Sequence, residues 1–63
     1  MQYREAKKLA PNDRVRRISD QLVLIVSDIE VYGKFKFVRI NCRTSNGKLI
    51  SVYHNQIENI KEI

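Results

Sequence analysis

The stretch Phe35–Tyr53, FKFVRINCRTSNGKLISVY, decides the expected fold of this chain. Apolar residues alternate with polar ones in its first half, and a period of two is typical of a strand with one buried face. Asn46–Gly47 follows, and both residues tolerate the positive φ that a tight hairpin turn demands. We therefore predict strands at 35–44 and 49–53, joined by a hairpin. The inward face of the first of these strands carries Val38, Ile40 and Cys42.

Two further strands are predicted before this hairpin. Residues 22–32 are rich in β-branched side chains, apolar on both faces at first and alternating later, so this strand can serve two sheets if it bends midway. Gly33 supplies the turn that follows it. Residues 13–18 read as a first strand with Val15 pointing inward, and the polar residues 19–21 turn the chain.

The two ends of the chain complete the expected arrangement. Segment 1–10 holds good helix formers and predicts an N-terminal helix, which Pro11 ends because proline disfavours a helical residue before it. Residues 54–56 interrupt the strand pattern and predict a helical turn. A short last strand follows at 57–60. Five short strands with frequent turns predict a closed or nearly closed barrel over 11–63.

Length and composition limit the classes of protein to consider. A chain of 63 residues has room for one domain, 1–63, with one small core. One cysteine and one histidine provide neither a disulfide nor a four-ligand zinc site, so we expect no metal or cofactor and a reducing, cytoplasmic location. The longest apolar run, Leu22–Val26, is five residues long and far too short to cross a membrane. The polar first ten residues do not resemble a signal peptide.

Positive charge is concentrated in two parts of the chain. The sequence carries 12 Lys and Arg against 7 Asp and Glu, and the net charge is +5. Residues 1–17 and residues 34–48 hold this excess, while the remaining segments are acidic. These two segments could form a basic face that attracts phosphates or an acidic protein, or they could be an ordinary solvated surface.

The outward face of the predicted third strand is the most specific functional feature. Aromatic rings there can stack on bases and arginines can neutralise phosphates, an arrangement that suits single-stranded nucleic acid. In the alternative interpretation, which we favour at this point, Phe35 or Phe37 packs in the core beneath the N-terminal helix with Tyr3 or Leu9. The residues predicted to bind nucleic acid are Arg14, Arg16, Arg17, Phe35, Lys36, Phe37, Arg39, Arg43 and Tyr53.

Two stretches resemble those of SH3-like small barrels. Residues 11–15, PNDRV, resemble the Pro-Gly-Asp-x-Val opening of such barrels, and residues 53–60 look like a fourth strand, a helical turn and a fifth strand. The chain is similar in this way to small barrel proteins of bacteria, phages and mobile elements. Its opening and charge resemble barrels of the KOW kind. Residues 52–57, VYHNQI, look like the Tyr-Lys-His-Ala-Ile segment of Sm-like proteins.

The sequence therefore predicts a mostly β, five-stranded SH3-like barrel that acts by binding. The first functional hypothesis is a nucleic-acid-binding module with a basic face that contains aromatic rings. The alternative is a protein-protein interaction module, or an accessory protein of a phage or mobile-element assembly, that uses a sheet edge or an apolar patch. An enzyme ranks last because no acid, base and nucleophile converge. Neither a membrane nor a small-molecule substrate is implied, and the sequence leaves the oligomeric state open.

Overall fold

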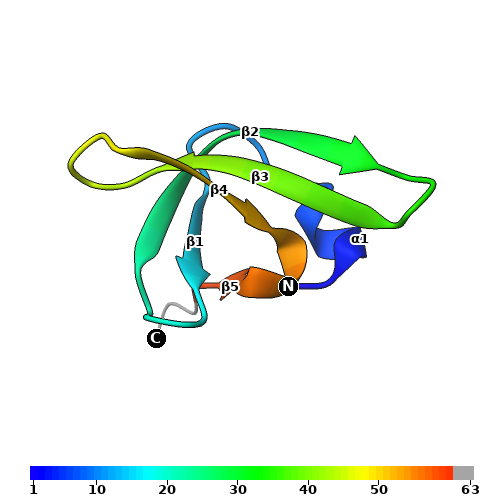
Figure 1. Ribbon diagram of the computed structural model, residues 1–63, viewed down its shortest axis with the longest axis horizontal. Coiled ribbons are helices and arrows are strands. Elements are labelled where there is room, and N and C mark those ends of the chain that lie inside the picture. The colour runs from blue at the N-terminus through cyan, green and yellow to red at the C-terminus, as the bar shows by residue number, and fades with distance from the viewer. Residues whose placement is uncertain (61–63) are drawn as a thin grey trace.

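All five predicted strands are present in the computed structural model, which describes residues 1–60 (Figure 1). The mostly β class is confirmed, and the last three residues of the predicted barrel, 61–63, lie outside the described residues. In chain order the elements are α1 (Tyr3–Ala6), β1 (Arg14–Arg17), β2 (Val23–Tyr32), β3 (Phe37–Arg43), β4 (Leu49–Tyr53), the 3-10 turn η1 (His54–Gln56) and β5 (Ile57–Asn59).

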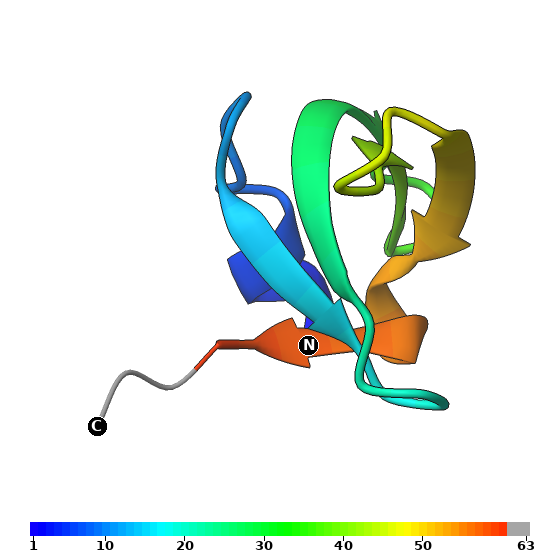
Figure 2. The ribbon, with the colours of Figure 1, turned by 90° about the vertical axis from the view of Figure 1, so that its left-hand side faces the viewer.

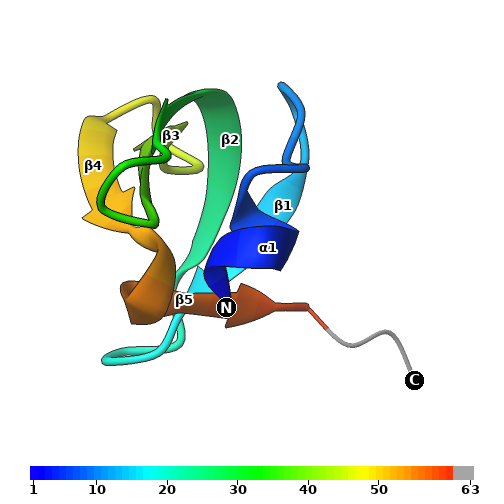
Figure 3. The same ribbon diagram turned by 90° about the vertical axis from the view of Figure 1, so that its right-hand side faces the viewer.

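The strands form one antiparallel sheet in the order β4-β3-β2-β1-β5. The sheet curls around a common interior, and α1 lies close to β5 (Figures 2 and 3). Over the described residues β5 pairs with β1 and not with β4, so the sheet is not closed, and of the closed or nearly closed barrel expected from the sequence the closed form is not present. The physical reason is local: η1 carries the chain from β4 to β5 without strand pairing, and β5 is only three residues long.

A β-bulge bends the long strand β2. Val26 pairs with Cys42 and Asp28 pairs with Asn41, which leaves Ser27 as the extra residue. The inward side chains of β2 therefore have even numbers before the bulge and odd numbers after it. The sequence left open whether this strand bends midway to serve two sheets; the bulge lies at residue 27, and the strand stays in one sheet.

The core lies between the sheet and α1. The predicted inward residues of β3 are all buried, and β1 contributes Val15 as expected. Cys42 is 1% exposed, and burial raises the pKa of its thiol to about 11, which favours the protonated, unreactive form. The buried apolar residues are Ala6, Val15, Leu24, Val26, Val38, Ile40, Cys42, Val52 and Ile57.

Two predicted boundaries are wrong. The N-terminal helix covers Tyr3–Ala6 and not segment 1–10, because the next two backbone bonds, from Lys8 N–H to the Glu5 carbonyl and from Leu9 N–H to the Ala6 carbonyl, each span three residues and tighten the turn. A helix this short depends on the packing of Ala6 in the core for its stability. The third strand begins at Phe37, so Phe35 lies in the turn before it.

Each of the three hairpin turns uses one residue with positive φ, and in the β1–β2 turn this residue is Gln21, with φ 63°. In the loop between β3 and β4 this residue is Gly47, with φ 86°, while Asn46 does not adopt the left-handed conformation expected from the sequence. The Thr44 N–H donates to the Lys48 carbonyl at 2.9 Å and closes a three-residue loop. In the β2–β3 turn, residues 33–36, the corresponding position is Lys36, with φ 52°.

We expect truncation of the buried Ile40 side chain to destabilise the protein more than truncation of an exposed aliphatic side chain on the outer face. Ile40→Val should lower the free energy of unfolding by about 0.5–1.5 kcal/mol, because it removes a methylene from a fully buried site. Leu49→Val, at a site 77% exposed, should change it by less than about 0.5 kcal/mol. Urea unfolding of both variants measures the difference. Equal losses would show that the core is not where we place it.

Candidate nucleic-acid interface

Three aromatic rings gather on the outer face of the sheet near the β2–β3 turn. The Tyr32 and Phe37 rings are stacked, with centroids 4.7 Å apart and planes inclined by 9°. The Tyr53 ring meets Phe37 edge-on at 5.5 Å. Strand register explains the contact, because Tyr32 pairs directly with Phe37. Tyr32 is 39% exposed and Tyr53 is 50% exposed, so this aromatic cluster offers accessible ring surface.

The interpretation of Phe35 as a core residue is wrong. Its side chain is 71% exposed, because the turn before β3 carries it away from the sheet. Phe37 is half-buried on the outer face by Tyr32 and Tyr53, and is not placed beneath α1. The ring of Phe35 lies near a cation, with Lys34 Nζ 6.0 Å from its centroid.

Two side chains of η1 complete a mostly apolar hollow beside the aromatic cluster. The hollow has a volume of about 240 Å³ and is lined by Phe37, Tyr53, His54 and Asn55. The Val38 N–H donates to His54 Nδ1 at 3.2 Å, so a neutral imidazole carries its proton on Nε2. The Gln56 Oε1 accepts from the Tyr53 N–H at 2.9 Å and fixes the turn.

A second hollow, lined partly by cations, lies next to the first. It has a volume of about 360 Å³ and is lined by Gln2, Tyr3, Arg4, Lys7 and Lys36. The Tyr3 ring, which lines the second hollow, meets the ring of His54, which lines the first, edge-on at 6.3 Å.

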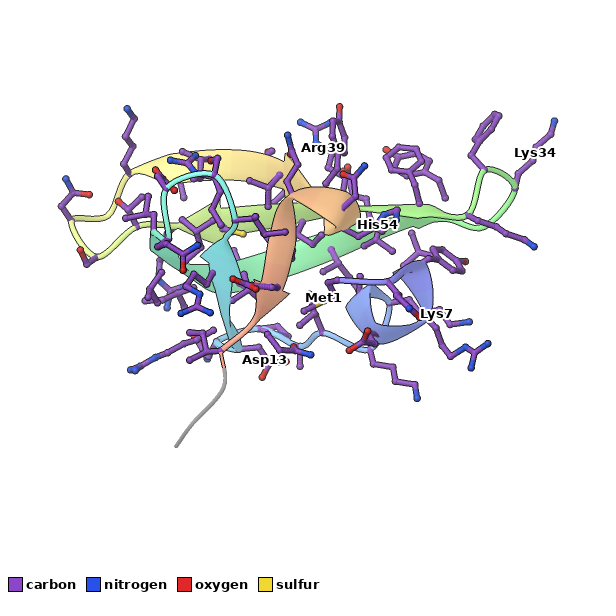
Figure 4. All side chains as sticks on the ribbon, turned by 90° about the horizontal axis from the view of Figure 1, so that it is seen from below. Met1, Lys7, Asp13, Lys34, Arg39 and His54 are labelled. Atoms are coloured by element: carbon purple, nitrogen blue, oxygen red, sulfur yellow. The ribbon has the colours of Figure 1, made fainter. Side chains whose placement is uncertain are left out.

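The cations around this second hollow come from two elements. Arg4 belongs to α1, and Figure 4 shows Lys7, the residue that follows α1, and Lys34, in the β2–β3 turn, toward the same end of the molecule. Within residues 1–60 no carboxylate lies in salt-bridge range of Arg4, Lys7, Lys34 or Lys36. Their charge is therefore available to an anionic ligand.

Three of the predicted phosphate-binding arginines are in ion pairs. Arg16 Nη2 is 3.1 Å from Glu58 Oε1, and Arg17 Nη2 is 2.6 Å from Asp20 Oδ2. The distance from Arg39 Nη1 to Glu30 Oε2 is longer, at 3.8 Å. The hydrogen bonds from Arg17 lower the pKa of the Asp20 carboxyl to about 2. These pairs reduce the positive charge that the arginines present to a ligand.

The other two predicted arginines lie at the far end of the outer face. Arg14 and Arg43 each pair with Ile25, from opposite sides of β2. A polar row separates them from the aromatic cluster: Asn41 Nδ2 donates to Asp28 at 2.7 Å, and the Ser51 hydroxyl donates to Asn41 Oδ1 at 2.8 Å. The structure thus gathers Phe35, Lys36, Phe37, Arg39 and Tyr53 at one end of the sheet and places Arg14, Arg16, Arg17 and Arg43 away from them.

Sequence reasoning missed six residues at this end of the molecule. Tyr32 could have been found, because it mirrors Phe37 across the turn at 33–36. Arg4 in α1 and Lys7 just after it line the same hollow, but no sequence pattern shows that they lie beside the β2–β3 turn. The missed residues are Tyr3, Arg4, Lys7, Tyr32, Lys34 and His54.

The comparisons with known proteins add no relationship. No family model matches the chain, and no curated protein or solved structure matches it. Within residues 1–60 no group of three His, Cys, Asp or Glu side chains is arranged to hold a metal ion. No helix in the described part of the chain is long and apolar enough to cross a membrane.

The Arg17–Asp20 pair gives a testable pH dependence. The folded-state pKa of Asp20 lies below its ordinary value of 3.8, so the pair's contribution to stability is present above that pH and is lost as the pH falls toward 2. NMR titration of the Asp20 carboxyl should give a pKa of about 2, and Arg17→Gln should return it toward 3.8. An unchanged titration in the variant would show that Arg17 is not held by Asp20.

Proposed function

We propose that this protein is a single-stranded nucleic-acid-binding module rather than an enzyme, built on an SH3-like small barrel. The meandering strand order and the helical turn between the last two strands support the fold assignment. One observation carries the functional proposal: a hollow lined by aromatic rings and a hollow lined partly by cations are neighbours, because His54 of the first meets Tyr3 of the second edge-on. A nucleotide needs this pair of environments, one for its base and one for its phosphate.

The aromatic cluster would bind bases. Stacking on an aromatic ring contributes roughly 1–3 kcal/mol per base and accepts any base, because every base has a π-face. Tyr53 borders the apolar hollow, and Phe35 extends from the adjoining turn with most of its ring exposed. The proposed ligand is single-stranded, since the bases of a duplex are paired and stacked on one another and cannot reach these rings.

The cations of α1 and of the β2–β3 turn would bind the phosphates. Arg4, Lys7 and Lys36 line one hollow, and Lys34 is next to Phe35 in the turn. Phosphates compete with no internal carboxylate for these four groups within the described residues. The net charge of +5 adds long-range attraction to a polyanion.

The proposed interface therefore differs in part from the set of residues expected from the sequence. Four of the predicted arginines are outside it. Arg16 and Arg17 are in ion pairs, and Arg14 and Arg43 are far from the rings. Arg39 is adjacent to Tyr53 across the strand pair and remains in it. The proposed interface comprises Tyr3, Arg4, Lys7, Tyr32, Lys34, Phe35, Lys36, Phe37, Arg39, Tyr53 and His54.

Stacking can be tested with two substitutions of similar exposure. Phe35→Ala should weaken binding of a mixed-sequence single strand of roughly 16 nucleotides by about 1–3 kcal/mol, because it removes a stacking ring. Leu49→Ala is the matched control, since both side chains are more than 70% exposed and Leu49 lies at the other end of the sheet. Fluorescence anisotropy measures both affinities. Failure of the unmodified protein to bind the strand at low salt would refute the proposal.

The phosphate contacts can be tested through the salt dependence of binding. The slope of the logarithm of the association constant against the logarithm of the salt concentration should become less steep by about 0.7 in Lys36→Asn. This is the change expected for the loss of one phosphate contact with a single strand. Asparagine is chosen because it tolerates the positive φ at position 36. Lys48→Gln removes the same charge at the far end and should leave the slope unchanged. Equal changes in both variants would indicate a net-charge effect without a defined site.

A further inference from the structure

The exposed apolar side chains of this protein fall into separate groups. Within residues 1–60, eight large apolar or aromatic side chains are exposed, and four of them, Val31, Tyr32, Phe35 and Tyr53, belong to the aromatic end just described. Ile18 lies in the turn between β1 and β2. The remaining three, Leu22, Val23 and Leu49, lie beyond the polar row at the opposite end of the sheet.

Leu22, Val23 and Ile25 line one hollow, and Leu49 lies in the same row of paired residues as Ile25, with Arg43 between them; we call these four residues the aliphatic patch. Arg14, Ile25, Arg43 and Leu49 occupy one row of paired residues that crosses four strands. Phe37 and Arg43 are the two ends of β3, about 20 Å apart at the rise of an extended strand, so this patch and the aromatic cluster are distinct surfaces.

A hollow opens beside the patch. It has a volume of about 570 Å³, and its walls include Leu22, Val23, Ile25 and Ser45. In Figure 2 this end of the molecule faces the viewer, with the β1–β2 turn below and the β3–β4 turn beside β2. The hollow therefore lies between two turns and is open to a ligand from outside.

The chemistry of the patch differs from that of the nucleic-acid interface. Its apolar groups are branched aliphatic chains, which bury against other aliphatic groups and offer no ring for a base to stack on. Three cations border it, Arg14, Arg43 and Lys48, and within the described residues none of them has a carboxylate in salt-bridge range. The Arg43 guanidinium donates only to the neutral amide of Asn12, at 3.0 Å.

The charge around the patch selects one kind of partner. The acidic residue that lines the hollow, Asp20, is already bound to Arg17. An acidic partner would neutralise the three bordering cations, whereas a second copy of this chain, with a net charge of +5, would bring further positive charge to the same place.

We infer that the aliphatic patch is a docking surface for an acidic segment of another protein, whose branched aliphatic side chains enter the hollow beside Val23 while its carboxylates meet Arg14 and Arg43. This inference does not depend on the proposed nucleic-acid function. The two surfaces lie at opposite ends of one sheet, so the protein can hold a nucleic-acid strand and a protein partner at the same time.

Selection from a display library of random linear peptides tests the inference. The folded protein should enrich peptides that combine Asp or Glu with Leu, Ile or Val. The enriched peptides should bind Val23→Asp and Leu49→Asp more than about tenfold more weakly, because each change removes an aliphatic contact and adds a repelling carboxylate. Arg14→Gln and Arg43→Gln should also weaken binding and reduce its salt dependence. NMR spectra of each isotope-labelled variant check that it is folded. We expect Leu49→Asp to fold, because the Leu49 side chain is 77% exposed.

Control variants and alternative occupants decide the outcome. Phe35→Ala and Lys36→Asn, at the other end of the sheet, should leave peptide binding unchanged. The inference is overturned if no peptide is enriched, if the enriched peptides are neutral or basic, or if they bind Val23→Asp and Leu49→Asp normally. Concentration-dependent self-association that Leu49→Asp abolishes would identify a second copy as the occupant, and loss of oligonucleotide binding in this variant would identify nucleic acid. Either result would also overturn it.

Discussion

The bulge at Ser27 is the constraint on which both surfaces depend. Without this extra residue, the inward positions of β2 would stay even-numbered, and Asp28, Glu30 and Tyr32 would face the core. Burying two carboxylates without partners would cost several kcal/mol or more, which a core of this size could not offset. The outer-face side chains of β2 are apolar before the bulge and mostly polar after it, and the bulge reverses the alternation at this point. It thereby places Tyr32 on the outer face, against Phe37.

The sequence was sufficient to predict the strands but not to predict which residues meet on the two surfaces. Alternation in residues 38–42 and the Asn46–Gly47 pair located β3 and β4, because both signals act over a few residues. The sequence left open whether the sheet is closed or nearly closed, since closure depends on whether β4 meets β5 across η1, and no local pattern specifies that contact. The helix was predicted too long for a related reason: propensity was present, but only one turn packs against the core.

The sequence predicted the candidate site only in part, because the number of charged residues does not show which of them form ion pairs in the fold. A count of arginines identified a basic chain, but Arg16 and Glu58 are 42 positions apart and meet only because β1 pairs with β5. The same holds for the cations of α1, whose position beside the β2–β3 turn follows from tertiary packing. The favoured core placement of Phe35 or Phe37 was wrong, because alternation assigns Phe37 to the face opposite Val38 but does not show that Tyr32 and Tyr53, rather than α1, cover it.

The polar row of Asp28, Asn41 and Ser51 separates the two ends of the outer face at which we propose the two interfaces. Its hydrogen bonds satisfy the side chains within the sheet, and the carboxylate of Asp28 repels a phosphate backbone. Glu30, paired with Arg39, adds a second carboxylate next to this row. A polyanion bound at the aromatic cluster would therefore leave the sheet toward α1, where the cations have no internal partner among the described residues. The aliphatic patch stays clear of that path.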